Sequence, residues 1–371
     1  MENVKRIKWL DVARSLAIIS ITCNHAVNRS FSTEVGQYAE FLKLPFAYTV
    51  LKAVIYAFSR IGVPLFLMIT GALMLNKDYE KEGTIGRFVK HNWLQLFITT
   101  EIWHIILFIY MQISPDSALR TDGVIACLIS FVKTLLFIDP TTFGSMWYMH
   151  MILCAYLLVP VFAIALKRIK ASYFIIPIAI VAISGLILPD VNGTLHVLGS
   201  GKTVSFALSA ANVFSIFAAF MLFGYFVTQK DLLKKFKTPI IVLLMLLSFA
   251  AFCAFQIWCY SKEPDFVVAE GYRSIFCFVP ALFLFELLRR LNYGERFASA
   301  ATFLSRIAFG IYFVHICIMQ GLTEIWGRIF PSVNYLPKFL LLEVVSFIGS
   351  IVVILVLGKI KWCRKNLFVI K

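Results

Sequence analysis

Charged residues are scarce in this sequence. Only 15% of its 371 residues are Asp, Glu, Lys or Arg, against about 25% in soluble globular domains. Hydrophobic residues make up 60% of the chain, and the mean hydropathy is +0.84. This composition excludes an ordinary soluble domain and predicts an integral membrane protein that crosses the bilayer many times.

Closely spaced cysteine pairs and internal repeats are also missing. Nearly all of the cysteines fall within apolar runs, so they predict neither a disulfide framework nor a metal site. The inverted repeat typical of many transporters is not visible in the sequence. The apolar runs are too long for outer-membrane barrel strands, which alternate over about 10 residues.

Ten apolar segments are long enough to cross a membrane as helices. They lie at 9–26, 57–75, 90–112, 146–166, 171–188, 206–227, 239–260, 272–289, 304–323 and 339–358. A further apolar segment, 123–138, is shorter and is interrupted by Lys133. We therefore predict an all-α membrane fold in one domain over 1–371, with about ten transmembrane helices and a re-entrant or interfacial helix near 123–138.

The distribution of basic residues orients these spans. If 123–138 does not cross the membrane, most of the 35 Lys and Arg residues fall on the side of the N-terminus. Because cytoplasmic loops carry the excess of Lys and Arg, we expect both termini in the cytoplasm and the protein in a bacterial cytoplasmic membrane. The net charge of +15 then reflects topology and contact with membrane lipids, and it does not indicate nucleic-acid binding.

The first span contains charged residues within an apolar run. Its stretch DVARSLAIISITCNHAV (11–27) includes Asp11, Arg14 and His25. A charge at membrane depth costs at least about 2.5 kcal/mol, so such residues usually have a role. Arg14 and His25 share one helix face, roughly 16 Å apart along the axis. Arg14 is either paired with Asp11 for structural reasons or a clamp for an anion such as phosphate, and His25 is either an interfacial polar group or a catalytic base.

Three further basic residues lie at predicted span ends. Arg60 is expected at the outer end of the second span, ahead of Pro64 and Gly71, two residues that packing alone explains. Arg87 and Lys90 are expected at the cytoplasmic mouth of the third span. They are either ordinary positive-inside anchors or contacts for phosphate.

Histidines occur in three other spans. His150 is expected one turn below Trp147 at the outer interface, and His315 near the middle of the membrane. Glu101 and His104 have the i, i+3 spacing of half a carboxylate di-metal motif. No second Glu-x-x-His occurs, so we expect no metal site.

Four of these segments together resemble the membrane acyltransferase-3 family, in the family's order and over most of the chain. The matching segments are Asp11-x-x-Arg14 with ten residues before His25, Arg60-x-x-Val-Pro-x-Phe-x-x-x-Thr-Gly71, Trp147-Tyr with Tyr-Leu-x-x-Pro160, and Gly310-Ile-Tyr-x-x-His315. The proline that commonly follows the Arg87 and Lys90 positions is absent. The Trp-Ser-Leu-x-x-Glu segment of larger members and a hydrolase segment after the last span are absent too. The resemblance is therefore to the shorter, single-domain members that acetylate surface glycans such as enterobacterial common antigen.

The resemblance implies an acyl-CoA-dependent O-acyltransferase. Such enzymes move an acyl group, usually acetyl, from cytoplasmic acetyl-CoA to a sugar hydroxyl of a lipid-linked or surface glycan. Because a hydroxyl is a poor nucleophile near neutral pH, it needs a base, and His25 is the residue we expect in that role. Arg60 or His150 is expected to orient His25 or to stabilise the oxyanion.

The same resemblance assigns residues to acyl-CoA. We expect Arg14, Arg87 and Lys90 to bind the CoA phosphates, with Asp11 and His315 in the same binding set. Acetyl-CoA is then a substrate, and no tightly bound cofactor or metal is expected.

Two alternatives stay open at this point. A transporter or flippase uses charged residues along a membrane path equally well. An acyltransferase with another donor, such as a succinyl group, or with peptidoglycan or an antibiotic as acceptor, would keep the same fold.

Overall fold

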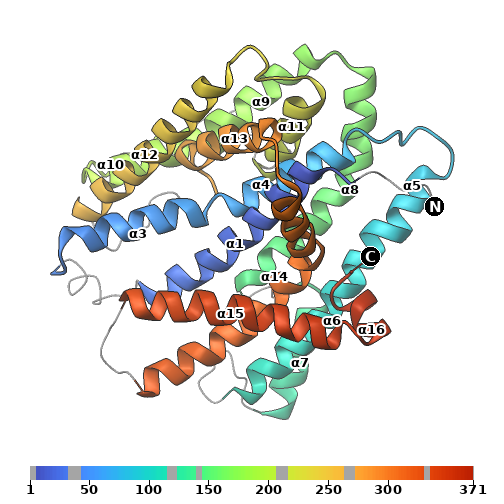
Figure 1. The fold of residues 1–371 in the computed structure, drawn as a ribbon, viewed down its shortest axis with the longest axis vertical. Helices are drawn as coiled ribbons and strands as arrows, with labels where there is room; N and C mark the ends of the chain where they lie inside the picture. The colour runs from blue at the N-terminus through green and yellow to red at the C-terminus, as the bar shows by residue number, and fades with distance from the viewer. Residues whose placement is uncertain are drawn as a thin grey trace. The chain divides into compact units, whose positions relative to one another are not determined.

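The computed structural model describes residues 6–31, 43–114, 123–138, 144–205, 216–262, 272–329 and 335–370. All regular secondary structure within these ranges is helical, and none of it is strand (Figure 1). The predicted all-α fold is confirmed.

Ten helical segments correspond to the ten predicted spans. They are α1 (Lys8–Ser30); α3 and α4 (Phe46–Ser59, Gly62–Met74); α5, η1 and α6 (Thr84–Phe88, Val89–Trp93, Leu94–Ile113); α8 (Trp147–Arg168); η4, α9, η5 and α10 (Ala171–Phe174, Ile175–Ala182, Ile183–Ile187, Leu188–Val197); α11 (Ile216–Gln229); α12 (Thr238–Lys262); α13 (Ile275–Arg290); α14 (Glu295–Ile329); and α15 (Tyr335–Leu357). Two short helices, η3 (Gly144–Met146) and α16 (Lys361–Asn366), flank α8 and α15. Residues 206–215 of the sixth predicted span lie outside the described ranges.

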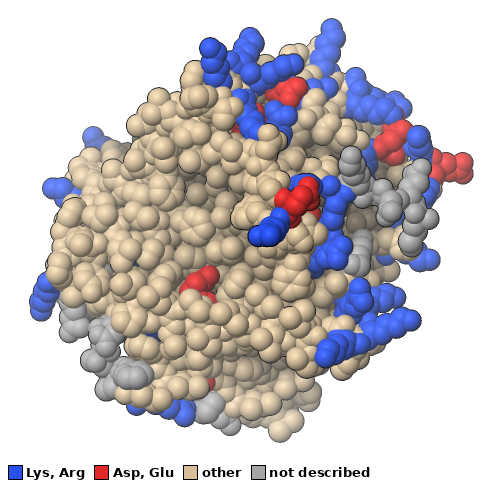
Figure 2. All heavy atoms as spheres, viewed as in Figure 1, with Lys and Arg blue, Asp and Glu red and all other residues tan. Residues whose placement is uncertain are grey.

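Seven of the described segments are long and apolar enough to cross a membrane, judged by their length and composition. The other three, α1, α11 and α13, are shorter or carry charges. Large apolar side chains such as Ile176 and Leu247 are exposed, at 70% and 57%. On the face drawn in Figure 2, most of the area carries no Lys, Arg, Asp or Glu. Such a surface suits contact with lipid tails, as expected for a multi-pass membrane protein.

The segment near 123–138 forms the short helix α7 (Val124–Leu135). Its 12 residues would rise about 18 Å, less than the ~30 Å thickness of a bilayer core. Val124, Ile125 and Leu128 are 78%, 75% and 58% exposed. Length and exposure agree with the interfacial or re-entrant helix predicted there.

The predicted start of the second span at 57 is wrong. Helix α3 begins at Phe46, and a break at Arg60 and Ile61 separates it from α4. Arg60 therefore lies inside the apolar segment Phe46–Met74 and not at its outer end. Lys52 lowers the apparent hydropathy of α3, but its ammonium lies 4.4 Å from the Tyr260 ring centre, where a cation–π contact stabilises it.

The fifth span continues beyond its predicted end at 188. A π-helical turn, η5, leads into α10, which has Pro189 in its first turn and ends at Val197. Proline has no backbone N–H, and Pro189 lies just after the π-helical turn, where the hydrogen-bond pattern of this helix changes.

The helices group into two compact units that alternate along the chain. Unit 1 comprises Met1–Lys77, Ala165–Ser305 and Tyr335–Phe339, and unit 2 comprises Asp78–Ile164, Arg306–Asn334 and Leu340–Lys371. Within unit 1, α4 packs on α11 and α1, while α12 packs on α13 and α3 (Figure 1). Within unit 2, α6 packs on α7 and α16. A single domain over 1–371 stays a prediction.

Two glycines let α4 and α11 approach until their backbones touch. A Cβ atom on Gly71 would lie 1.8 Å from the carbonyl oxygen of Met221, and one on Gly224 would lie 2.0 Å from that of Met68. Small residues commonly allow such close approach between membrane helices. Among the described glycines, these two have the least room for a Cβ atom.

Candidate functional site

The predicted site residues fall into both units. Unit 1 holds Asp11, Arg14, His25 and Arg60, and unit 2 holds Arg87, Lys90, His150 and His315.

Asp11 is the centre of a buried polar cluster in unit 1. Its side chain accepts hydrogen bonds from Arg6 Nε at 2.8 Å, Ser305 Oγ at 2.7 Å and Thr302 Oγ1 at 3.0 Å, and the residue is only 2% exposed. Buried carboxylates are stable when their oxygens are paired in this way. Asp11 therefore joins the start of α1 to the start of α14.

Arg14 is held by the same cluster. Its Nη1 donates to Ser305 Oγ at 2.7 Å and lies 3.4 Å from Asp11 Oδ1, so the predicted Asp11–Arg14 pair is present. Arg6, which precedes the helix, lies closer to the Asp11 carboxylate than Arg14 does, at 2.8 Å. This pair could not be predicted from the sequence, because a spacing of five residues matches no side-chain pair on a helix. The Arg14 side chain keeps 26% of its surface exposed, which leaves room for an anion.

The far end of α1 packs against the break between α3 and α4. Ser20 Oγ donates to the carbonyl oxygens of Phe58 and Ser59 at 2.8 and 3.0 Å. Ser59 Oγ lies 3.4 Å from Asn24 Oδ1, to which it donates. His25 is half-buried beside Asn24. These bonds fix the end of the helix that carries the imidazole.

The helix face between Arg14 and His25 is apolar. Ile18 is fully buried and Ile21 is 4% exposed. Polar groups therefore occupy the two ends of this face, and apolar side chains lie between them.

Arg60 sits among aromatic rings at the α3–α4 break. Its guanidinium carbon lies 4.5 Å from the Tyr56 ring centre and 5.7 Å from that of Tyr272. Cys277 Sγ donates to the Arg60 carbonyl oxygen at 3.4 Å. Such cation–π contacts stabilise a buried cation where water is scarce.

Arg87 and Lys90 form an exposed basic surface in unit 2. Both residues are exposed, and Lys90 lies in the π-helical segment η1. Gln95 Nε2 donates to the Lys365 carbonyl oxygen at 3.2 Å, which brings α16 and its basic residues to the same end of α6. π-helical turns frequently mark functional sites.

Tyr79 packs against the residue that lies between the cations of this basic surface. Its ring lies 5.3 Å from that of Phe88, the buried residue between Arg87 and Lys90. Burial raises the pKa of Tyr79 to about 12, so the phenol stays neutral and adds no negative charge beside the two cations.

His150 meets a second histidine. Its Nε2 lies 3.0 Å from Nε2 of His104, and Nδ1 of His104 lies 3.3 Å from Oε1 of Glu101. The Phe137 ring is 5.2 Å from the His104 ring and 5.1 Å from the His150 ring. The spacing of Glu101 and His104 was visible in the sequence, but the contact with His150, 46 residues away, was not. Among the described residues, no group of three His, Cys, Asp or Glu side chains could hold a metal.

His315 is fully buried, and its Nδ1 bonds to the Ile311 carbonyl oxygen at 2.7 Å within α14. A side chain placed in this way has no exposed surface for the phosphates of a CoA molecule. That His315 contacts acyl-CoA stays a prediction.

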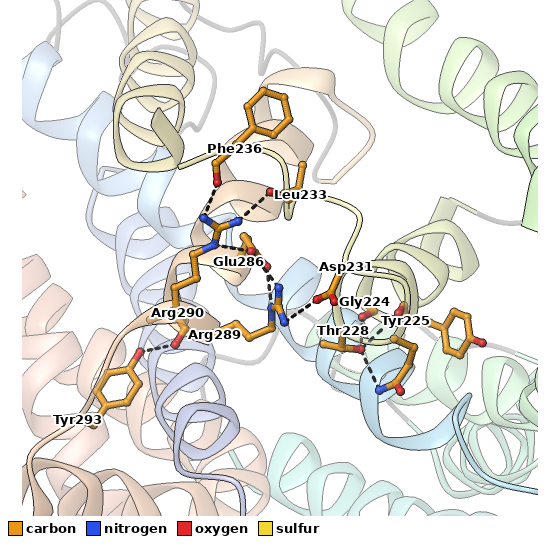
Figure 3. Close-up of polar contacts among 12 residues, drawn as sticks. Gly224, Tyr225, Thr228, Asp231, Leu233, Phe236, Glu286, Arg289, Arg290 and Tyr293 are labelled. Carbon is orange, nitrogen blue, oxygen red and sulfur yellow. Dashed lines mark hydrogen bonds and ion pairs between the residues drawn. The ribbon is translucent and has the colours of Figure 1, made fainter. Parts of the chain in front are cut away.

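Glu286, which the sequence left without a role, holds two arginines in unit 1 (Figure 3). The fully buried carboxylate accepts from Arg289 Nε at 2.8 Å and also pairs with Arg290. Arg290 donates to the carbonyl oxygens of Leu233 and Phe236, at 2.8 and 2.6 Å. This cluster fastens the segment after α11 to the end of α13, so its role is structural.

The chain matches one family model along nearly its whole length. The model of the acyltransferase-3 family, described as an acyltransferase domain, covers residues 7–357. No curated protein and no solved structure matches the chain significantly. The chain belongs to the acyltransferase-3 family and is a multi-pass membrane acyltransferase.

Proposed function

We propose that this acyltransferase moves an acetyl group from cytoplasmic acetyl-CoA to a hydroxyl of a lipid-linked or cell-surface glycan on the opposite side of the membrane. The family match over 7–357 carries the proposal. The excess of Lys and Arg on the side of the N-terminus supports the orientation, with both termini in a bacterial cytoplasm.

In this proposal His25 is the general base. Its neutral imidazole takes the proton of the acceptor hydroxyl while the hydroxyl oxygen attacks the thioester carbonyl carbon. The carbon–sulfur bond then breaks, the acetyl group stays on the sugar oxygen, and the CoA thiolate leaves and receives the proton. The hydrogen bond from Ser20 to Phe58 and the one that Asn24 accepts from Ser59 hold the histidine end of α1 in place for this step.

Arg14, Arg87 and Lys90 supply positive charge for the phosphates of acetyl-CoA. Arg14 is partly exposed and Arg87 and Lys90 are exposed. Arginine binds phosphate through two parallel N–H groups, whereas lysine acts as a point charge. Asp11 takes part by holding Arg14, through Ser305 and directly.

The Asp11→Ala variant tests this positioning role. We expect it to lose about 3 kcal/mol of stability, because two arginines lose a buried carboxylate partner, and to raise the KM for acetyl-CoA. Thermal unfolding in detergent and initial rates against acetyl-CoA concentration would measure both effects. Thr302→Val is the matched control, since it removes one hydrogen bond to the same carboxylate and should cost only about 1 kcal/mol. Equal effects of the two variants would contradict a central role of the Asp11 charge.

The double variant Arg87→Ala/Lys90→Ala tests the basic surface. We expect the KM for acetyl-CoA to rise about tenfold while kcat changes little, because two charge contacts to phosphate are lost before the chemical step. The effect should shrink at high salt, where exposed charges are screened. Lys235→Ala, an exposed basic residue of unit 1, is the control. An unchanged KM would remove these residues from acetyl-CoA binding.

The proposed function itself is tested with purified protein in liposomes that contain bacterial glycolipids. Radiolabelled acetyl-CoA is added outside or inside, and label in the extracted glycan is counted. Transfer from one side only supports the proposal and its orientation. If label stays in CoA while glycolipid crosses the membrane, the protein is a flippase and the proposal fails.

A further inference from the structure

The Glu101–His104–His150 cluster has no task in the steps described so far. One contact of 3.0 Å, between His104 and His150, joins α6 to α8 within unit 2, and a second of 3.3 Å links Glu101 to His104 within α6. The His104 side chain is only 1% exposed, whereas His150 is half-buried. His104 is therefore too deep to meet a ligand itself, but it can hold His150, which has accessible surface.

Each imidazole nitrogen in this cluster can donate or accept, so the protonation of Glu101 decides which tautomer both histidines adopt. With Glu101 ionised, Nδ1 of His104 donates its proton to Oε1, and Nε2 of His104 is left as an acceptor. Nε2 of His150 then donates to that nitrogen, so Nδ1 of His150 carries a free electron pair. A neutral imidazole in this tautomer accepts a hydrogen bond from a hydroxyl group, and it has no charge with which to bind phosphate.

An aromatic ring borders the cluster. Phe137 lies against both imidazoles, and its backbone has φ +57, in the left-handed region that residues other than glycine seldom adopt. Non-glycine residues in this region are strained and concentrate at functional sites. Trp147 precedes His150 by three residues and so lies on the same face of α8. Flat apolar faces beside one fixed polar group are typical of sites for small organic ligands.

We propose that this cluster is a subsite for the sugar ring of the acceptor, in which Glu101 is ionised and His150 accepts a hydrogen bond from a ring hydroxyl. Phe137 and Trp147 provide apolar faces for the ring, and Glu101 and His104 are positioning residues for His150. The inference rests on the proposed function, since it takes the acceptor to be a glycan.

Kinetic analysis with a defined acceptor tests this subsite. The probe is an octyl N-acetylhexosaminide, with rates measured against its concentration and against acetyl-CoA. We expect His150→Ala and His104→Phe to raise the KM for the glycoside about tenfold, the effect of one ordinary hydrogen bond, with the KM for acetyl-CoA unchanged. Glu101→Gln retains an acceptor for His104 and should change the KM less than threefold. His196→Ala, an exposed histidine of α10, is the matched control.

A binding measurement without acetyl-CoA separates this inference from the proposed function. Saturation-transfer NMR with the methyl N-acetylhexosaminide should show magnetisation transfer to the sugar protons by wild-type protein, and loss of it with His150→Ala. If wild-type protein binds the sugar but transfers no acetyl group, the proposed function fails and the subsite stands.

Two results would overturn the subsite. One is an acceptor KM within twofold of wild type, with unchanged saturation transfer, for both His150→Ala and His104→Phe. The other is a rise in the KM for acetyl-CoA in place of the acceptor. The thermal unfolding midpoints of both variants, compared with that of wild type, show whether the variants are folded. His104→Phe is chosen because it keeps a ring in the buried position.

Discussion

The His25→Ala variant is expected to slow acyl transfer by a factor between about 10² and 10⁴. Removing a general base slows such reactions by about 10²–10⁴, and no other imidazole lies on α1. His25 is only half-buried, and its substitution leaves the buried hydrogen bonds of Ser20 and Asn24 in place. The variant should therefore lose activity without losing stability. We therefore expect kcat to collapse while the thermal midpoint stays near that of wild type.

The measurement is label transferred from acetyl-CoA to glycolipid, at matched amounts of purified protein. His196→Ala serves as the control, and it should behave like wild type. Transfer by His25→Ala at the wild-type rate would exclude His25 from the chemistry and would make His150 the next candidate for the base.

The second large effect is expected at the contact between α4 and α11. Gly71→Ala places a methyl group 1.8 Å from the Met221 carbonyl oxygen, and Gly224→Ala places one 2.0 Å from that of Met68. Because the obstacles are backbone atoms, the two helices have to move apart. We expect each variant to lose about 3 kcal/mol or more, at the upper end of what overpacking costs.

Thermal unfolding of purified protein, followed by loss of the folded peak on size exclusion, measures this loss. Gly327→Ala is the matched control, because nothing lies within 4 Å of its added methyl group. Gly327 lies in the last turn of α14, so this change should stabilise the helix by no more than the roughly 0.5–1 kcal/mol expected in a helix interior. Similar midpoints for Gly71→Ala and Gly327→Ala would show that α4 and α11 are further apart than described.

The helices could be predicted from the sequence because water is absent from the lipid core. A long apolar segment there satisfies its backbone N–H and C=O groups by forming a helix. The start of α3 could not, since the Lys52 charge is offset by the Tyr260 ring, which is far away in the sequence. The Asp11–Arg14 pair could be predicted from helical spacing. Arg6, Thr302 and Ser305, which complete that cluster, and the meeting of His104 with His150 depend on packing between distant segments.

The Asp11 cluster also has a consequence for biosynthesis. Thr302 and Ser305 follow Asp11 by 291 and 294 residues. At about 5–20 residues per second, the ribosome needs roughly 15–60 s to reach them after it has made α1. Throughout that interval, the nascent helix meets the membrane with Arg6 and Arg14 as the counter-ions of its carboxylate. The two arginines thus make the first helix acceptable to the insertion machinery before the final partners exist.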